Sequence, residues 1–595
     1  MPTNALTSFS ARAAANSNRA ALVLALVVLA AAPLLAQKVP VTDKTLPNGM
    51  RVLLVERHDE PSIAGGWVAH VGSSNEKPGM TGIAHLFEHM MFKGTPTIGT
   101  TNYQRDLEII AAQERVRDQM RAEESAMRAR LRRGEVDDIT KPENKTARWK
   151  ELEKEFQALI TEQRQILVKN EFDRIYTSNG ASGMNAFTTQ DLTGYFITVP
   201  ANKLELWLWM ESERLLRPVF REFYAERDVV FEERRMRTES TPLGKFAETF
   251  ESMFWEAHPY GWPVIGWASD IPAISKAQAD EFFAIYYAPQ NITAILVGDF
   301  KTEEAFRLME RYFGRIPRGK TEVPDVVTLE PQQPAEKRML AEAETNPQVD
   351  IYWHTVPFGH RDSYPLQVLA QVLNGRTGRL YRGLVLGSQI ATEAGGGQYS
   401  LKWSGIFNIT GEAKEGKSPE EVEQGLYAEL QKLKEQEVPA EELQKVKNNF
   451  AANEYRKLSS NMSILMQLIQ NDGMGNWREI NEAGPKLQAV TAGDVKRVAE
   501  KYFIKENRAV GIYTRKSGSK TDEDPDLNGL TAEQKPVIRQ IAGALKTETD
   551  LSKLKARMQE LEGRARLADD KTKPFLNIFR KKLAARIAEL EQGAK

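Results

Sequence analysis

The stretch Ile274–Gly298, ISKAQADEFFAIYYAPQNITAILVG, is matched later in the chain by Val490–Thr514, VTAGDVKRVAEKYFIKENRAVGIYT. Both copies have a helix-capping Ser or Thr, the same spacing of apolar residues and an aromatic residue pair near the helix end. Each copy continues into a β-rich run that is typical of a strand. The repeat therefore predicts a chain built from two related halves, each containing helices and strands.

These halves account for most of the chain. We expect the first half over residues 37–317, a polar, Pro-containing linker over 318–337 and the second half over 338–516. Residues 517–595 are rich in charge, and helical patterns return within them. We interpret this tail as a helical appendage without a third large core.

Composition limits the chemistry of the protein. The chain has 595 residues and a formal net charge of −1, so no global charge favours nucleic acid or an acidic membrane surface. It contains no cysteine, which excludes disulfides, thiolate nucleophiles and cysteine-bound metal clusters. Any protein-bound metal must therefore use His, Asp or Glu.

The N-terminus has the pattern of an export signal. Arg12 and Arg19 precede an apolar run, Ala20–Ala36, which ends in small residues. This pattern predicts a signal peptide over residues 1–36 that is removed near Ala36. The alternative is an uncleaved anchor, for which the run is slightly short. We expect the mature chain to be periplasmic or extracellular, with no membrane span.

Residues 103–173 differ in composition from their surroundings. Charges alternate densely there, and the turn-forming residues gather in one central stretch, RRGEVDDITKPENK. On the second arm, apolar residues recur at spacings of three and four, as on one face of a helix. We predict a long antiparallel helical hairpin, inserted into the first half, that is either an arm for a partner or substrate or a solvated spacer.

The motif HLFEH places His85, Glu88 and His89 in a segment predicted to be helical from Thr81 to Lys93. Residues at i, i+3 and i+4 share one helix face, so both imidazoles can reach one zinc ion. Glu88 is placed to take a proton from a water molecule on that ion. The alternative is a helix that carries two ordinary, hydrogen-bonded histidines.

Several segments carry a resemblance to a known family. The stretch HLFEHMMFKGT, which begins at His85, resembles the inverted zinc motif of the insulinase/pitrilysin (M16) metallopeptidases, a family that includes the mitochondrial processing peptidase. GMNAFTTQDLTGYF, ERDVVFEE and AHPYGWPVIGW are similar to later landmarks of that family. The resemblance implies an α+β fold of two ferredoxin-like halves, each an antiparallel sheet covered by helices. It also implies a zinc metalloendopeptidase.

The same resemblance implies roles for two glutamates in ERDVVFEE. Glu233 aligns with the third zinc ligand, and Glu232 should point elsewhere because adjacent helix residues differ by about 100° in direction. Glu226 lies two turns before Glu233 and corresponds to a residue that orients a metal ligand. A surface salt bridge is the alternative role for Glu226. The inserted hairpin explains the long separation of His89 from Glu233.

Asn185 and Ala186 resemble the edge strand on which family members bind an extended peptide through its main chain. Such binding implies peptides or unfolded polypeptide segments as substrates, with loose sequence preference. The alternative for Asn185 is a turn residue.

The second half departs from the family pattern. Many relatives carry an Arg and a Tyr there that hold the substrate, whereas Val385 and Thr392 occupy the aligned positions in this chain. We therefore expect a dimer, first with a related subunit that lacks the zinc motif but carries the Arg/Tyr pair, and second with another copy of this chain. The other hypotheses are a non-catalytic assembly subunit and an exported protein that stores or delivers metal.

Overall fold

The computed structural model describes residues 38–516, 530, 534–548, 550–568 and 572–593. The predicted signal peptide, residues 1–36, lies outside the described residues. The chain forms two compact units, one ending at Arg515 and the other beginning at Lys516. Within the described residues, no helix is both long enough and apolar enough to cross a membrane.

The first half is built on a six-stranded sheet in the order β1-β2-β6-β3-β5-β4. Its strands are β1 (Thr42–Thr45), β2 (Arg51–Glu56), β3 (Ser62–Ala69), β4 (Ser182–Thr188), β5 (Thr193–Pro200) and β6 (Ile292–Gly298). Strand β4 is the last strand in this order, and no described strand pairs with its other edge.

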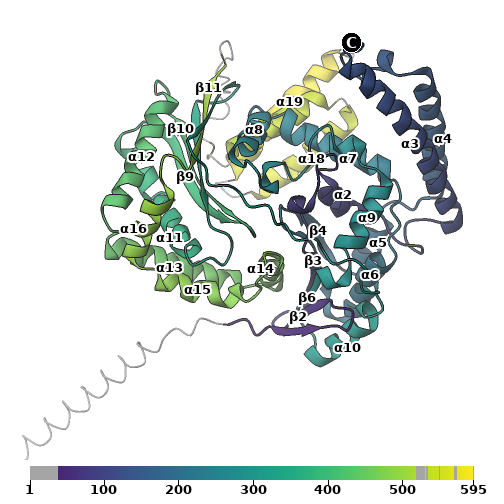
Figure 1. Cartoon of the computed structure of the whole chain (residues 1–595), viewed down its shortest axis with the longest axis horizontal. Coiled ribbons are helices and arrows are strands. Elements are labelled where there is room, and N and C mark those ends of the chain that lie inside the picture. Colours follow the sequence, from purple (N-terminus) through teal and green to yellow (C-terminus); the bar gives the residue numbers. More distant parts are fainter. Residues whose placement is uncertain (1–37, 517–529, 531–533, 549, 569–571, 594–595) are drawn as a thin grey trace, which may run out of the picture. The chain divides into compact units, whose positions relative to one another are not determined.

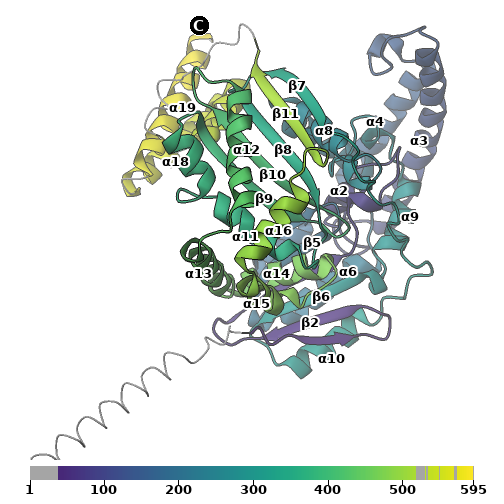
Figure 2. The same ribbon diagram turned by 60° about the vertical axis from the view of Figure 1, so that its left-hand side comes forward.

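The second half repeats this arrangement in a five-stranded sheet with the order β7-β11-β8-β10-β9. Its strands lie side by side in Figure 2 and are β7 (Lys337–Ala343), β8 (Gln348–Thr355), β9 (Ala391–Ser400), β10 (Gly405–Ala413) and β11 (Arg508–Arg515). The expected mixed α+β fold of two similar halves is confirmed.

The family resemblance implied antiparallel sheets, but each sheet also contains one parallel pair of strands. Strands β2 and β6 pair in parallel, and so do β7 and β11. In each half the last strand inserts between two strands that run in opposite directions, so it must be parallel to one of them. This insertion places the strand of each repeated stretch in the interior of its sheet.

The predicted repeat is observed as α9 (Lys276–Tyr286) followed by β6, and as α16 (Ala492–Tyr502) followed by β11. Both helices begin with a capping box, from Ser275 in one half and Thr491 in the other. The strands that follow are largely buried, as expected for the interior of a sheet.

Helices cover the sheets (Figure 1). Besides α9, the helices of the first half include α2 (Ile83–Met90), α5 (Glu171–Ser178), α6 (Leu204–Leu216), α7 (Phe223–Arg234), α8 (Gly244–Phe254) and α10 (Thr302–Phe313). Those of the second half are α11 (Ser363–Leu373), α12 (Pro419–Glu435), α13 (Ala440–Lys457), α14 (Asn461–Gly473) and α15 (Glu479–Ala489).

The two halves exchange one helix each. Helix α14 of the second half packs against β3 and β6 of the first sheet, where Leu465 and Ile469 are fully buried. Helix α8 of the first half packs against the second sheet, where Phe250 contacts Tyr352 edge to face. Each sheet therefore buries one of its faces with help from the other half.

Replacing Leu465 by Ala should destabilise this first unit by about 2–5 kcal/mol, because the substitution leaves a cavity in a fully buried layer. Denaturant unfolding followed by near-ultraviolet circular dichroism would measure the loss. Leu386→Ala is the matched control, since that side chain is largely exposed and its truncation should change stability by less than about 0.5 kcal/mol. Equal effects of the two substitutions would contradict the packing role of α14.

The contact made by α8 should also depend on pH. His354 stacks on Phe254 at 3.8 Å between ring centroids, and His258 lies nearby against Trp255. Burial lowers the pKa of each histidine from 6.5 to about 4, so both stay neutral in the fold. Between pH 4 and pH 6.5, each histidine therefore takes up a proton when the protein unfolds. The contribution of the two neutral histidines to the free energy of unfolding is fully present above pH 6.5. It should fall toward pH 4, by at most about 1.4 kcal/mol per pH unit for each histidine.

Thermal unfolding of the wild type across this pH range, compared with a His258→Asn/His354→Phe variant, would measure the dependence. The variant should show a flatter profile between pH 6.5 and 4. An unchanged profile would contradict this assignment to the two histidines.

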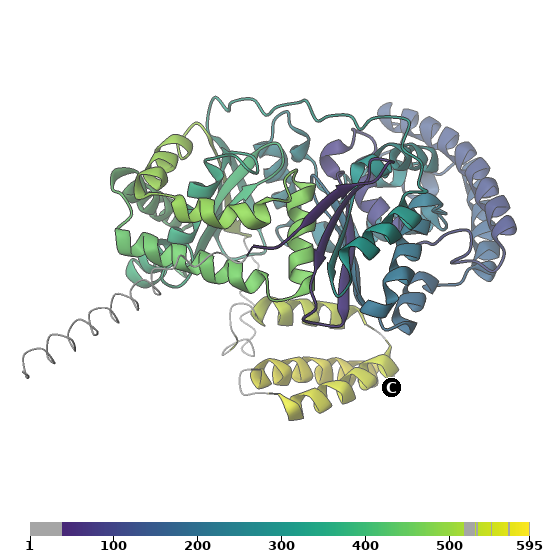
Figure 3. The same cartoon turned by 90° about the horizontal axis from the view of Figure 1, so that it is seen from below.

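The inserted hairpin is present as α3 (Tyr103–Arg132) and α4 (Ala147–Ile166), which pack along each other (Figures 1 and 3). Leu152 and Phe156 of α4 are buried, together with Val116 and Met120 of α3. Tyr224 of α7 stacks edge to face on Phe156. This segment of the hairpin is therefore packed against the body of the first half.

The described residues of the second unit form three helices, α17 (Gln534–Thr547), α18 (Leu551–Leu567) and α19 (Lys573–Gly593). Both α17 and α18 contact α19, and the three helices are drawn in yellow in Figure 3. A small apolar core that includes Leu554 and Leu583 lies between them.

Candidate metal centre

The helix that carries HLFEH is shorter than the sequence predicts, beginning at Ile83 and ending at Met90. Thr81 does not cap it, because its hydroxyl donates to Asp270 at 2.8 Å. Instead the Glu76 carboxylate accepts from the N–H groups of Gly82 and Ala84 at 2.9 and 2.8 Å. Gly82 has φ +90°, and an added Cβ would lie 2.5 Å from the Ile265 carbonyl oxygen. The start of the zinc-motif helix is thus fixed from outside the helix.

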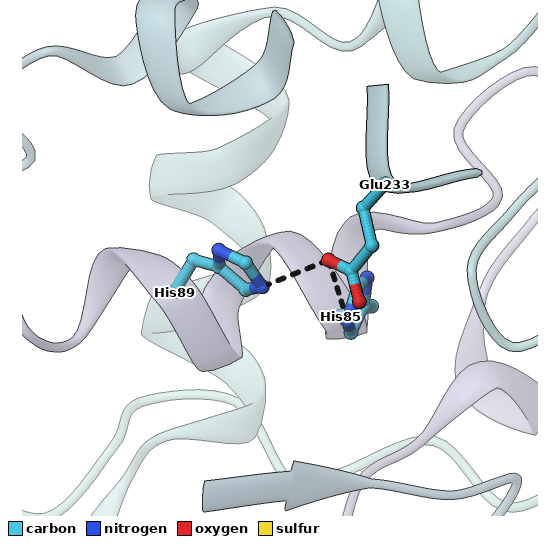
Figure 4. A group of neighbouring side chains, drawn as sticks. All are labelled: His85, His89 and Glu233. Carbon is cyan, nitrogen blue, oxygen red and sulfur yellow. Dashed lines mark ion pairs between the residues drawn. The ribbon is translucent and has the colours of Figure 1, made fainter. Parts of the chain in front are cut away.

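Helices α2 and α7 bring together the three residues predicted to bind metal. His85 Nε2 and His89 Nε2 lie 3.8 and 3.5 Å from the same oxygen, Oε2 of Glu233 (Figure 4). The two histidines come from successive turns of α2, and the glutamate comes from the C-terminal turn of α7.

The spacing of these atoms fits a tetrahedral ion. Two ligands that are each about 2.1 Å from a tetrahedral centre lie about 3.4 Å apart. The three side chains offer one ligand atom each, all within 4.8 Å of one another. Two imidazole nitrogens and one carboxylate oxygen are ligands typical of catalytic zinc, which also leave one position for water.

His85 is buried and held in a form that can bind metal. Burial, helped by the charges of His89 and Arg237, lowers its pKa to about 3, so the imidazole is neutral. Its Nδ1 has no hydrogen-bond partner among the described residues. The zinc-binding role proposed for His85 therefore rests on Nε2, without support from a second group on the other nitrogen.

His89 has that support. Its Nδ1 lies 2.9 Å from Oε1 of Glu226, which leaves Nε2 to face Glu233. Burial lowers the His89 pKa, but the hydrogen bond and the charge of Glu226 outweigh burial and raise it. Lys93 Nζ pairs with the other oxygen of Glu226 at 2.5 Å. Glu226 is thus placed between a candidate ligand and a cation, as a residue that orients the imidazole would be.

Replacing Glu226 by Gln should weaken zinc binding by about ten- to hundredfold, because the imidazole loses its charged partner. Competition with a chromogenic chelator would measure the change. Glu222→Gln is the matched control, since Glu222 also approaches Lys93, at 3.5 Å, whereas the ion pairs of His89 are with Glu226 and Glu233. Similar zinc affinity for wild type and Glu226→Gln would contradict the orienting role.

Glu88 lies on the same helix face, between the two histidines in sequence. Its Oε2 accepts a hydrogen bond from the Thr188 hydroxyl of β4 at 2.7 Å. Burial raises the pKa of Glu88, and the Thr188 hydrogen bond and the charge of His89 partly offset that rise. A carboxylate with a raised pKa is suited to accept and return a proton near neutral pH.

Arg237 is another residue of the site that the sequence analysis missed, as it missed Thr188 and Lys93. Arg237 Nη2 forms an ion pair with Oε1 of Glu233 at 2.8 Å, so the two oxygens of Glu233 face different partners. Arg237 follows Glu233 by one helical turn, and that i,i+4 spacing is the signal that could have found it. Glu232 points elsewhere and pairs with Arg235 at 2.8 Å.

Asn185 and Ala186 lie on β4, the edge strand that contacts α2. The Asn185 side chain accepts from the Ala186 N–H at 2.9 Å. Both residues line a cavity of about 490 Å³ together with Glu88 and His89. The exit of the inserted hairpin, residues 167–172, forms another wall of the same cavity.

The positions expected to lack the Arg/Tyr pair serve local structure. Val385 packs partly buried against the core of the second half. Thr392 lies on β9 and donates to the Glu412 carboxylate at 2.8 Å. Arg379 pairs with Glu442 at 2.7 Å.

Comparison with known proteins identifies the family. The family model described as insulinase (peptidase family M16) matches residues 51–121, and the model described as peptidase M16 inactive domain matches residues 273–450. The chain belongs to peptidase family M16. The zinc motif lies inside the first match, and the second match runs from the end of the first half through the linker into the second half.

The M16 chain is similar to the zinc protease PqqE of Helicobacter pylori, at 26% identity over 79% of this chain and 92% of the relative. The crystal structure of a protease from the same species matches with a TM-score of 0.66 and 23% identity, over 80% of this chain and all of that one. The periplasmic protease PqqL of Escherichia coli matches with a TM-score of 0.58 and 16% identity, over 81% of this chain but only 48% of PqqL.

These relatives support a peptidase for the M16 chain and zinc as its metal. The structural matches establish the shared two-half fold.

Proposed function

We propose that the protein is a zinc-dependent endopeptidase that cleaves peptides or unfolded polypeptide segments. One observation carries the proposal: Glu88 and the three candidate ligands His85, His89 and Glu233 converge beside an edge strand. A metal-storage site would need the ligands alone. It would not need a partly buried carboxylate of raised pKa beside an edge strand.

Zinc bound by these ligands would supply a polarised water molecule and a Lewis acid for the peptide carbonyl. Glu88 would take the proton from that water on Oε1, since its Oε2 is held by Thr188. The same carboxyl group would then give the proton to the departing amine. Thr188 fixes the carboxylate toward the strand on which the substrate backbone would lie.

Strand β4 would orient the substrate as an added strand. Asn185 and Ala186 would face its main chain, and the adjoining cavity would take a side chain near the cleaved bond. Because main-chain pairing needs an extended segment, a folded protein would be a poor substrate.

The active assembly would contain a second M16 subunit. PqqL has about twice the length matched by this chain, so its single chain has room for two such pairs of halves. Here a related subunit with the Arg/Tyr pair would supply the missing groups, and a second copy of this chain is the other arrangement. The periplasmic location named for PqqL agrees with the export proposed from the N-terminal sequence.

The test is to purify the chain alone and with any co-expressed M16 neighbour, then to measure bound zinc and cleavage of a quenched peptide. Zinc with cleavage in at least one preparation is expected. Zinc without cleavage in both would favour a non-catalytic subunit, a reading that the match of residues 273–450 to the inactive-domain model supports. A fully active monomer would contradict the need for a partner.

A further inference from the structure

The inserted hairpin reaches the metal centre through a buried ion pair at its base. Asp106, on the first turn of α3, is fully buried, and its Oδ2 accepts from Arg221 Nε at 2.5 Å. Its Oδ1 accepts from Gln163 of α4 at 2.9 Å, and Gln113 holds Gln163 in turn at 3.1 Å. Both arms of the hairpin therefore fix the carboxylate that faces Arg221.

Arg221 uses its remaining donors on the loop that directly follows α2. Its Nη1 donates to the carbonyl oxygens of Lys93 and Ile98 at 3.1 and 2.9 Å, and Nη2 donates to that of Thr95 at 2.6 Å. The side chain is 1% exposed, so its charge depends on Asp106 for compensation. The hairpin thus supplies the anion that allows a buried guanidinium to hold this loop.

The loop in turn holds the partner of a candidate zinc ligand. Lys93 is fixed through its carbonyl by Arg221, and its Nζ pairs with Glu226. Glu226 then contacts His89 Nδ1. A continuous series of contacts therefore runs from Asp106 to an imidazole of the metal centre, and the side chain of each residue in it is at least three-quarters buried.

The same loop is tied to the exit of the hairpin. Thr100 forms an isolated bridge with Leu167, and the Gly99 N–H donates to the Glu171 carboxylate at 2.6 Å. The two ends of the insertion therefore lie close together. A spacer with adjacent ends would not need a buried charge in its first turn.

We infer that the base of the inserted hairpin is part of the metal centre, with Asp106 and Arg221 as positioning residues that act through Lys93 and Glu226 on His89. This inference rests on the proposed zinc site. It assigns the insertion a function in metal binding that is separate from any partner or substrate contact along its length.

The test compares zinc affinity, by chelator competition, in wild type, Asp106→Asn and the double variant Asp106→Leu/Arg221→Met. The double variant removes both charges, which is the better tolerated change for a buried pair. Both variants should bind zinc about ten- to hundredfold more weakly than wild type does. In cleavage assays of Asp106→Asn, kcat should fall while KM for the peptide stays near that of wild type, because β4 is untouched and Asp106 does not line the cavity.

Arg105→Gln/Glu162→Gln is the matched control. It breaks an exposed ion pair between the same two arms, next to Asp106, and should leave zinc affinity unchanged. Unfolding of the metal-free proteins shows which variants remain folded. If both Asp106 variants fail to fold, Lys93→Met tests the inference instead, because this substitution alters a partly exposed side chain. Lys93→Met should also weaken zinc binding about tenfold.

Wild-type zinc affinity in a folded double variant, or in Lys93→Met where neither Asp106 variant folds, would overturn the inference. Absence of zinc from the wild type would instead overturn the proposed function. The two failures are therefore distinguishable.

Discussion

The Glu88→Gln protein is expected to keep its zinc and to lose peptide cleavage, with kcat reduced by about 10²–10⁴ or more. The amide has nearly the same shape and can keep the Thr188 hydrogen bond, but it cannot accept a proton from water. Zinc content by atomic emission and single-turnover cleavage of a quenched peptide would measure both properties. The loss should appear in kcat, since Glu88 is not expected to bind the peptide backbone.

Glu232→Gln is the control for this substitution. Glu232 lies beside the candidate ligand Glu233 but pairs with Arg235 on the exposed side of the helix. Its replacement should leave cleavage within about twofold of wild type, as is usual for a surface change of less than about 0.5 kcal/mol. Unchanged cleavage by Glu88→Gln would remove this residue from the mechanism.

Removal of the metal is expected to abolish activity, and His85→Ala should have the same effect because one of three protein ligands is lost. Wild type should bind one zinc per chain and regain activity when zinc is restored after chelation. Zinc should also raise the melting temperature of wild type, since a ligand at a hundred times its dissociation constant stabilises the fold by about 2.7 kcal/mol. His85→Ala should show no such rise.

His58→Ala provides the comparison for His85→Ala. His58 pairs with Asp299 and Glu56 at an exposed site and is not one of the three candidate ligands. Its replacement should preserve the zinc-dependent rise in melting temperature. Recovery of activity by His85→Ala with added zinc would show that the remaining two side chains suffice, contrary to the proposed ligand set.

The sequence could predict those parts of the fold that depend on local pattern. The repeated helix and strand, the long hairpin and the division into two similar halves follow from capping residues and apolar spacing. The helix exchange could not be predicted, because an apolar face on α14 shows that something covers it but not which sheet does. The start of α2 was misplaced because Glu76, outside the expected helix, satisfies its first N–H groups.

The candidate site shows the same division. His85, Glu88 and His89 are neighbours on one helix, so their spacing alone places them together. Glu233 comes from a distant helix and was predicted only by resemblance to a family. Arg221 and Asp106 were not singled out, because a buried ion pair between residues far apart in sequence leaves no periodic signal.

The exchanged helices have a consequence for synthesis of the chain. All six strands of the first sheet are complete once Gly298 has been made, but α14, which buries Leu53 and Ile295 on one face of that sheet, begins only at Asn461. The apolar face of the first sheet therefore stays uncovered while the ribosome translates the residues between Gly298 and Asn461, which are more than a quarter of the chain. A gene truncated after the first half should yield a product that aggregates, because α14, which covers the apolar face of the first sheet, belongs to the second half, which contains no candidate metal ligand.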